Sequence, residues 1–471
     1  MKKLNEICDC DINVEINDIK NNSKEVKKGD LFVCIKGVNV DRHNFIVEAI
    51  KNGCSALIVS RDGNYGVPYV KVKDPNKELG KISKKFYNNP LKKIKLIGIT
   101  GTDGKTTTAS ILRNMIANDR CGYIGTNGVY SKNKIITTNN TTPEINETYK
   151  YLDFFVKENL KYATMEISSE ALLLNRTNTL KLDVAVLTNI TEDHLNVHKT
   201  IENYIKSKLK IFSLLKKSGV AVLNRDDFYY QYIKTKIKNR TLTFGKSKDS
   251  DLQIINIKEK DNNTIFTFKY LNNIYKVKTS LKGEYNIYNL SGAILSMIGL
   301  GFTIKEAITR ISNIETVSGR CEFLEYGQNY KIVLDYAHTE NGLKKILMYL
   351  NKIKKNRIIT VTGSAGGREK QKRSQMGKTV LELSDLVIFT MDDPRFEDVN
   401  NIIDDMTSKC KKTNYIRIIN REEAINKALS IAKNDDIVLI AGKGRDNYMA
   451  IGDKKILYCD FNAIDKYFKK I

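Results

Sequence analysis

The sequence predicts an α/β protein of three domains: a small α/β domain over residues 1–94, a central domain with a mostly parallel sheet over 95–318, and a Rossmann-like domain over 319–471. Two observations support this. At 471 residues the chain is longer than one hydrophobic core usually serves. Short apolar runs typical of buried strands alternate with helical patterns along most of the chain, which favours parallel strands covered by helices.

Composition narrows the class of protein. A hydrophobic content of 41% and a charged content of 28% are ordinary for a globular protein. No apolar run approaches the roughly 20 residues that cross a bilayer, and the segment from Met1 to Glu6 lacks the apolar core of a signal peptide. The eight cysteines show no metal-ligand spacing. We therefore expect a cytoplasmic protein with free thiols and no membrane insertion.

The formal net charge of +24 raises the question of a polyanionic partner. The lysines are spread along the whole chain and mixed with acidic residues, rather than gathered in a binding stripe. We therefore expect no nucleic-acid partner, although a phosphorylated substrate would benefit from the same field. The alternative, a basic nucleic-acid-binding protein, predicts strongly salt-dependent affinity for DNA or RNA.

In the first domain, we expect strands at 30–35, 56–59 and 69–72, a helix over 45–52, and a second helix that ends near Tyr87. Pro90 and the lysines after it indicate a linker.

A glycine-rich stretch opens the central domain. The apolar run Leu96–Ile99 predicts a strand, Gly101–Gly104 a turn, and Lys105–Thr108 the start of a helix. Free backbone N–H groups, a lysine and a hydroxyl that can ligate Mg²⁺ together indicate a nucleotide phosphate site. The full P-loop pattern has a glycine where Ile99 stands, so a turn that merely links strand and helix is the alternative.

Further strands are expected in the central domain at 162–166, 184–189 and 219–224, followed by an antiparallel edge hairpin within 251–280. After Gly319-Arg320 a new α/β series begins, with strands at 332–334, 358–361, 386–389 and 437–440.

Polar residues follow four of these strands directly: Glu166, the segment 191–194, the segment 335–338 and the segment 392–395. Ligands of open α/β sheets bind at the carboxyl ends of strands. Each group alone could be a satisfied turn, but the four together predict a ligand site.

Lys208 stands out on a helical wheel of residues 201–215. It lies in the middle of the apolar stripe, whereas Lys206 and Lys210 fall on the opposite side. An interior lysine must lose its proton, find a counter-charge or be chemically altered. The alternative is a lysine that reaches past its neighbours to water.

These segments resemble the Mur ligase family almost from end to end. The matching motifs are Asp30–Val33, Gly101–Thr107, Thr141–Glu144, Met165–Ser169, Thr188-Asn189, Asp193–Leu195, Tyr204–Lys208, Gly319-Arg320, Asp335–Thr339, Lys372-Arg373, Met376-Gly377 and Ala441–Gly444. The resemblance implies a UDP-binding, an ATPase and an amino-acid-binding domain, in that order. It also implies a monomeric ATP-dependent ligase that adds a diamino acid to the D-glutamate of UDP-N-acetylmuramoyl-L-alanyl-D-glutamate through an acyl phosphate, in peptidoglycan precursor synthesis.

By the same resemblance, roles fall on individual residues. ATP would contact Gly101, Thr102, Asp103, Gly104, Lys105, Thr106, Thr107, Asn286, Asn289, Arg320 and Asp335. The UDP-sugar and dipeptide would contact Ser23, Val38, Asn39, Val40, Asn140, Thr141, Thr142, Ser168 and Arg176. The incoming amino acid would contact Arg368, Asp392, Asp393, Pro394, Arg395, Gly442 and Asp446.

The resemblance also implies metal sites and catalytic residues. Thr106 would face one Mg²⁺, and Glu166 and His194 would bind a second. Lys208 falls on the family's carbamoylated lysine, in which CO₂ turns a neutral amine into a carboxylate-like group. The expected catalytic residues are Lys105, Glu166, His194 and Lys208. The sequence departs from the family pattern at Asp103, Glu170, Leu174 and Arg445-Asp446, where Asn, His, Gln and His-Glu are usual.

The choice of amino acid rests on Asp392-Asp393-Pro394-Arg395. Family members that use meso-diaminopimelate carry Asp-Asn-Pro-Arg here, and the arginine fork holds the distal carboxylate. We therefore favour meso-diaminopimelate. Asp393 instead of Asn could repel that carboxylate or favour L-lysine, and Arg395 could simply form a surface ion pair with Asp392 or Glu397. The alternatives are the same chemistry with L-lysine or another amino acid and, more remotely, a P-loop phosphotransferase.

Overall fold

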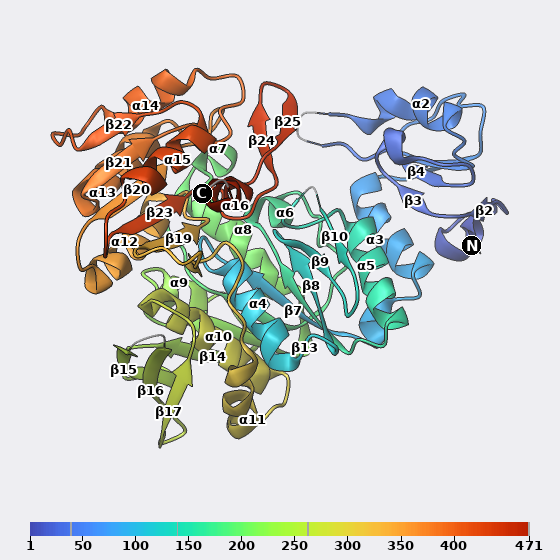
Figure 1. Ribbon diagram of the computed structural model, residues 1–471. Coiled ribbons are helices and arrows are strands. Elements are labelled where there is room, and N and C mark those ends of the chain that lie inside the picture. The colour runs from blue at the N-terminus through green and yellow to red at the C-terminus, as the bar shows by residue number, and fades with distance from the viewer. Residues whose placement is uncertain (38–39, 139, 261–262, 470–471) are drawn as a thin grey trace.

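The computed structural model describes residues 1–37, 40–138, 140–260 and 263–469, which form three α/β units in chain order (Figure 1). In the N-terminal unit a parallel sheet has the order β3-β4-β5-β6. Its strands are β3 (Ile19–Lys20), β4 (Leu31–Val33), β5 (Ala56–Val59) and β6 (Tyr69–Lys71), with helices α2 (Ile46–Lys51) and α3 (Pro75–Phe86). The predicted elements of this unit are therefore present, and three of them (β4, β6 and α2) are shorter than predicted.

An eleven-stranded sheet forms the central unit, in the order β10-β9-β8-β11-β7-β12-β13-β14-β15-β16-β17. The strands are β7 (Lys95–Thr100), β8 (Cys121–Gly125), β9 (Gly128–Tyr130), β10 (Ile135–Ile136), β11 (Tyr162–Glu166), β12 (Leu182–Leu187), β13 (Leu215–Asn224), β14 (Arg240–Gly245), β15 (Leu252–Lys260), β16 (Asn263–Tyr270) and β17 (Asn273–Thr279). The strands from β8 to β15 in this order pair in parallel, and the outer strands at both edges pair antiparallel. This confirms the mostly parallel sheet and the antiparallel edge after residue 251.

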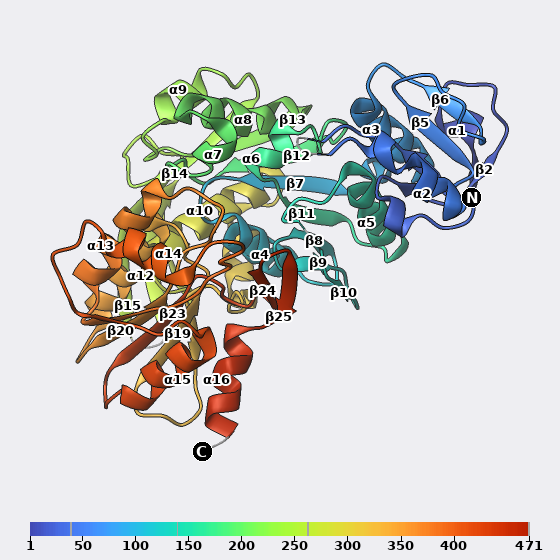
Figure 2. The same cartoon turned by 90° about the horizontal axis from the view of Figure 1, so that it is seen from above.

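Alternation along the central strands sends side chains to two covered faces. Ile97 and Ile99 pack with α4 (Lys105–Ile116) and α10 (Glu284–Gly299) on one face. Leu96 and its neighbours on β11 and β12 pack with α5 (Ile145–Lys157) and α8 (Ile201–Ser213) on the other. That second core continues into the N-terminal unit, because α3 packs against α5 (Figures 1 and 2).

The C-terminal unit is a six-stranded sheet in the order β18-β19-β23-β20-β21-β22, parallel apart from β18. Its strands are β18 (Glu322–Leu324), β19 (Lys331–Asp335), β20 (Ile358–Thr362), β21 (Leu386–Phe389), β22 (Tyr415–Arg417) and β23 (Ile437–Ala441). Helices α12 (Glu340–Ile353), α13 (Gln371–Leu383) and α14 (Val399–Thr407) cover one face, and α15 (Arg421–Ile431) and α16 (Asp460–Lys469) cover the other. A hairpin of β24 (Tyr448–Ile451) and β25 (Lys454–Leu457) leaves this unit toward the N-terminal one (Figure 1).

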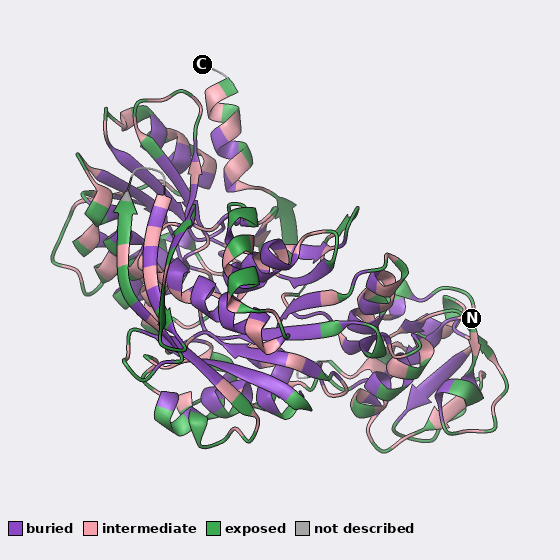
Figure 3. Ribbon diagram, turned by 90° about the horizontal axis from the view of Figure 1, so that it is seen from below, coloured by how far each residue is buried: buried purple, intermediate pink, exposed green. Residues whose placement is uncertain are grey.

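The inner strands of the sheets are buried along most of their length, and β5, β8, β20 and β23 are buried at every residue (Figure 3). Each unit holds one main sheet, and we propose 1–94, 95–318 and 319–471 as the limits of three domains. One local prediction was wrong: α8 ends at Ser213, before the end of the 201–215 wheel, because Leu215 already pairs with Leu182 as the first residue of β13. All eight cysteines are free. In the part of the chain described here, no helix has the length and apolarity needed to span a membrane.

Candidate active site

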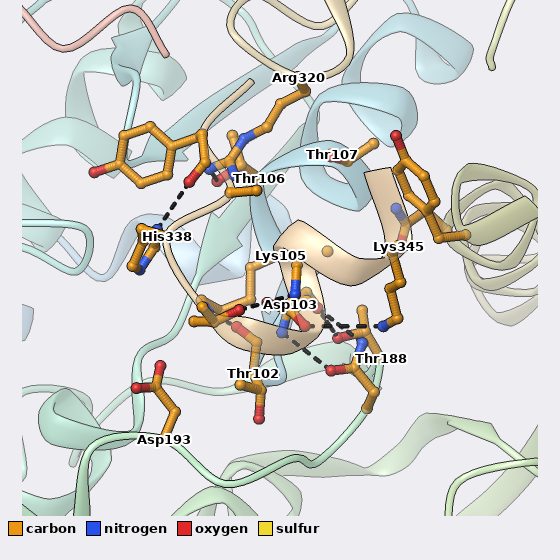
Figure 4. Close-up of a pocket in the computed structure, with 18 of the residues that line it drawn as sticks. Thr102, Asp103, Lys105, Thr106, Thr107, Thr188, Asp193, Arg320, His338 and Lys345 are labelled. Carbon is orange, nitrogen blue, oxygen red and sulfur yellow. Dashed lines mark hydrogen bonds and ion pairs between the residues drawn. The ribbon is translucent and has the colours of Figure 1, made fainter. Parts of the chain in front are cut away.

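A cavity of about 750 Å³ lies between the central and C-terminal units. The loop after β7, the end of β11, helix α8 and the segment after β19 all contribute to its wall. Figure 4 shows Thr102 to Thr107 around one end of the cavity, with Arg320, His338 and Lys345 of the C-terminal unit facing them. The carboxyl ends of strands from two sheets thus meet at one site, as expected for open α/β sheets.

The glycine loop leads into α4 through Gly104, which has a φ of +84°. A Cβ at Gly104 would collide with the side-chain oxygen of Asn289, so this position requires glycine for space as well as for backbone conformation. The helix begins at Lys105, whose Nζ donates to the carbonyls of Gly101 and Thr102, both at 2.9 Å. Burial lowers the pKa of Lys105. The loop therefore combines a helix N-terminus with a lysine, which suits phosphate oxygens.

Glu166, the last residue of β11, is fully buried below the loop. Its carboxylate accepts hydrogen bonds from the Thr106 hydroxyl at 2.8 Å, from the Thr126 amide at 2.9 Å and from the Tyr123 hydroxyl. Arg320 of the C-terminal unit donates to the same Thr106 hydroxyl at 3.1 Å. A carboxylate and a hydroxyl of the phosphate loop are thus in contact, which is the kind of oxygen pair that Mg²⁺ takes.

His194 stands in a left-handed conformation, with a φ of +56°, immediately before α7 (Leu195–His198). Burial lowers its pKa to about 3, so the imidazole is neutral and has a free lone pair. Its neighbour Asp193 is bound by Lys372 of the C-terminal unit at 3.2 Å. Although burial alone would raise the pKa of Asp193, the Lys372 ammonium beside it holds that pKa below the ordinary range.

Lys208 is 1% exposed, which confirms the predicted interior position on α8. Its Nζ donates to the Gly101 carbonyl at 2.7 Å and lies 4.4 Å from the centre of the Tyr204 ring. Burial, together with the charge of Lys105, lowers the pKa of Lys208 well below its ordinary value. This shift favours the neutral form of the amine at the cavity wall, which is the form that can react with CO₂.

The residues expected near the rest of ATP lie around the same end of the cavity. Asn289 lines it, and its amide donates to Asn286 at 3.1 Å. Asp335 ends β19 and accepts from the amides of Cys321 at 2.6 Å and Ala337 at 2.7 Å. Burial raises the pKa of Asp335. Asn289 thus lies on the cavity wall, whereas Asn286 is buried behind it.

Five of the residues expected to bind the dipeptide line the cavity: Asn140, Thr141, Thr142, Ser168 and Arg176. Thr142 ties two of the segments together, because its hydroxyl donates to the Glu166 carbonyl at 3.0 Å and accepts from the Ser168 amide at 2.9 Å. Ser23 lies apart in the N-terminal unit, where its hydroxyl donates to Glu48 at 2.5 Å. Val40 is exposed, and Val38 and Asn39 lie outside the described residues.

Among the residues expected to hold the amino acid, Arg368 lines the cavity. The others form a separate cluster behind Tyr336 and Tyr448, two tyrosines of the cavity wall. Tyr336 connects the two regions, since its hydroxyl donates to Asp446 at 3.1 Å. The Asp392 carboxylate lies so close to Gly442 that a Cβ on residue 442 would collide with it. Arg395 donates to the Gly366 carbonyl, while Glu397 is bound by Arg373 at 2.8 Å, so the surface ion pair considered for Arg395 is taken by another arginine.

Sequence reasoning missed the contacts that join the units. Asp103 of the glycine loop accepts from Asn341 on α12 at 2.8 Å, and Lys345 of the same helix lies 3.8 Å from it. Similarly, the Asn196 amide donates to Glu369 at 2.8 Å. The sequence did signal an unusual residue, because Asp103 stands where the family usually has Asn. Nothing local in the sequence, however, identifies Asn341, 238 residues away, as the partner of Asp103.

Could these residues hold a metal? Among the described residues, no three His, Cys, Asp or Glu side chains converge on a metal site by themselves. Glu166 with the Thr106 hydroxyl offers oxygen ligands, and neutral His194 offers a nitrogen. A carbamate on Lys208 would add the missing anionic oxygen, so the donor set suits Mg²⁺ when the lysine is modified.

Comparison with known proteins confirms the resemblance drawn from the motifs. The chain matches the Mur ligase family catalytic domain over residues 15–92, the Mur ligase middle domain over 99–297 and the Mur ligase glutamate ligase domain over 319–444. UDP-N-acetylmuramoyl-L-alanyl-D-glutamate--2,6-diaminopimelate ligase 1 of Clostridium acetobutylicum is 36% identical over 467 residues, covering 98% of this chain and 96% of that protein. A solved UDP-N-acetylmuramoyl-L-alanyl-D-glutamate--2,6-diaminopimelate ligase, 25% identical, covers 100% of this chain and 99% of its own with a TM-score of 0.67. MurF ligase from Thermotoga maritima in complex with ADP, 22% identical and covering 96% of this chain and 97% of its own, shares the fold with a TM-score of 0.70.

Proposed function

This chain belongs to the Mur ligase family, and we propose that it is the ATP-dependent ligase that joins meso-diaminopimelate to the D-glutamate of UDP-N-acetylmuramoyl-L-alanyl-D-glutamate. The observation that carries the proposal is the single cavity lined by the glycine loop, Glu166 and the buried Lys208 on one side, and by Arg320 and Arg368 on the other. Phosphate, carboxylate and amine chemistry can meet there. Relatives named as 2,6-diaminopimelate ligases cover nearly the whole chain.

The reaction has two steps, and this chain's residues position both. The carboxylate of D-glutamate takes the terminal phosphoryl group of ATP, which gives an acyl phosphate and ADP. The amine nitrogen of the incoming amino acid then attacks the acyl carbon, the carbon–oxygen bond to phosphate breaks, and the nitrogen loses a proton to give the amide. The amides at the start of α4, Lys105 and Arg320 neutralise charge on the transferring group, and the flanking units hold the other substrates in place.

The cofactors belong to the same proposal. Thr106, Glu166 and His194, with Lys208 as a carbamate, would hold Mg²⁺, which supplies charge neutralisation at the phosphates. The support for the carbamate is the burial of the Lys208 amine, which lowers its pKa and so favours the neutral form. We include action as a monomer in the cytoplasm in this proposal.

The choice of meso-diaminopimelate as the amino acid is supported by the contacts of Arg395 and of Asp393. Arg395 is held by a single carbonyl, so its guanidinium keeps N–H groups for a substrate carboxylate. Asp393 is already bound by Lys443 at 2.9 Å, so its charge is compensated within the protein. Both observations favour a diamino acid with a distal carboxylate over L-lysine.

The test is the rate of inorganic phosphate release from ATP with UDP-N-acetylmuramoyl-L-alanyl-D-glutamate and a panel of amino acids. We expect release that depends on both the nucleotide-linked dipeptide and an amine, and that is fastest with meso-diaminopimelate. Phosphate transfer without an amine would indicate a phosphotransferase instead. Faster release with L-lysine would overturn the choice of amino acid and leave the ligase chemistry in place.

A further inference from the structure

A second buried lysine, Lys443, lies beside the amino-acid cluster. It follows β23 between two glycines and is 1% exposed. Its Nζ contacts Asp393 Oδ1 at 2.9 Å and lies 3.8 Å from Asp446 Oδ2. Burial would lower the pKa of Lys443, but Asp392, Asp393 and Asp446 together raise it, so the side chain carries a positive charge.

Two contacts hold one carboxylate oxygen of Asp393. The carboxylate oxygen that binds Lys443 also accepts from the Ala450 amide of β24 at 2.9 Å. The Asp393 carbonyl accepts from the Gly366 amide at 3.0 Å. Its backbone is held in a left-handed conformation with a φ of +45°. Lys443 and the hairpin therefore fix both the charge and the direction of this side chain.

The same hairpin holds Arg395. Its amide donates to the Ala450 carbonyl at 3.0 Å, and its carbonyl accepts from the Gly452 amide at 2.7 Å. Ala450 therefore binds the Asp393 side chain through its amide and the Arg395 backbone through its carbonyl. A change at the Lys443–Asp393 pair acts on the segment that presents the arginine.

The ion pair between Lys443 and Asp393 affects the charge of the amino-acid cluster. Asp392, Asp393 and Asp446 are three acids within one small cluster, and Arg421 nearby is already bound by Asp460 at 2.7 and 2.8 Å. With Lys443 present, the charge of Asp393 is compensated and does not oppose that of Arg395, whose guanidinium donates to the Gly366 carbonyl. Without Lys443, an uncompensated carboxylate stands two residues from Arg395, where it repels a distal carboxylate and attracts a distal ammonium.

We propose that Lys443 is a specificity-determining residue: by binding Asp393 it makes the site select an amino acid with a distal carboxylate and reject one with a distal ammonium. This inference rests on the proposed function, because it assumes that the site binds the side chain of a diamino acid. It assigns discrimination to a residue that holds another protein side chain rather than the substrate.

The experiment compares meso-diaminopimelate with L-lysine as acceptor in wild type, Lys443→Met, Asp393→Asn and the double variant, using the ratio of the two kcat/KM values. Lys443→Met should shift that ratio toward lysine by about tenfold or more. Asp393→Asn alone should not shift the ratio toward lysine, because it removes the carboxylate and leaves the positive charge of Lys443 in place. The double variant should return most of the preference for diaminopimelate.

Lys354→Met is the matched control. Lys354 binds Asp385 at 2.9 Å in the same unit, away from the cavity, so the loss of that ion pair should leave the ratio unchanged. Equal losses with both amino acids in Lys443→Met would show a merely structural role and overturn the inference. If Lys443→Met does not fold, Asp393→Asn still decides, because a shift of the ratio toward lysine in that variant would contradict the charge argument and overturn the inference. A wild type that prefers lysine would instead refute the proposed substrate.

Discussion

Replacing Lys208 by methionine should abolish ligation and, at the same time, make the protein more stable. The ammonium-forming group is buried and has one carbonyl partner, Gly101, which also accepts from Lys105 at 2.9 Å. Methionine fills a similar volume and leaves no acceptor without a donor. The substitution therefore removes a polar group from an apolar stripe without creating a new unpaired one.

The size of the gain follows from the burial. An amine buried with incomplete compensation costs about 1–3 kcal/mol of stability in proteins. For a domain of this size, 1 kcal/mol corresponds to a shift of the melting temperature by about 2–4 °C. We therefore expect Lys208→Met to raise the Tm by several degrees in CO₂-free buffer. Lys206→Met, on the exposed side of the same helix, is the matched control and should change little.

The sign of the pH dependence provides a second check. The unfolded lysine titrates near pH 10.4, and the folded pKa lies well below that. Between these two values the unfolded state binds more protons, so wild-type stability rises with pH up to about 10.4. The Tm advantage of Lys208→Met should thus be greatest at low pH and shrink as the pH approaches about 10.

The assays are thermal melting, amine-dependent phosphate release and ¹³C NMR with labelled bicarbonate. Wild type should give a carbamate signal that Lys208→Met lacks, and the variant should lose at least about a hundredfold in turnover. A small carboxylic acid should restore part of the activity of Lys208→Ala. Full activity of wild type without CO₂, or a Tm of Lys208→Met at or below that of wild type, would refute the reasoning.

Three further substitutions test other parts of the site. Lys105→Ala should lower phosphate release by about a hundredfold or more with an unchanged far-ultraviolet circular dichroism spectrum, and normal turnover would remove the loop from the mechanism. Arg395→Ala should lower kcat/KM for meso-diaminopimelate by about tenfold or more and that for L-lysine far less; equal effects on both would contradict its role. Burial raises the pKa of Asp446 to about 6. If its carboxylate binds the amine, kcat/KM for the amino acid should rise with pH through about 6, and Asp446→Asn should lack that step.

How much of this could be foreseen depended on whether the signal was local. The parallel strands could be predicted from apolar runs, and the interior position of Lys208 could be predicted from the helical wheel. The end of α8 could not be predicted in this way, because it is set by the pairing of Leu215 with Leu182 in the sheet. Partners such as Lys443 for Asp393, 50 residues apart, carry no periodic pattern, since they meet only because β21 and β23 end at the same edge of the sheet.

The contact between Asp103 and helix α12 has a consequence for the timing of nucleotide binding. Asn341 and Lys345 belong to the C-terminal unit, and Asp103 belongs to the phosphate loop. Any rotation that carries α12 away strips the carboxylate of both partners and leaves a bare negative charge beside the place of the phosphates. That carboxylate would then oppose a polyphosphate in an open molecule, whereas Asn341 and Lys345 offset its charge in a closed one. Affinity for ATP is in this sense a property shared by two units rather than one.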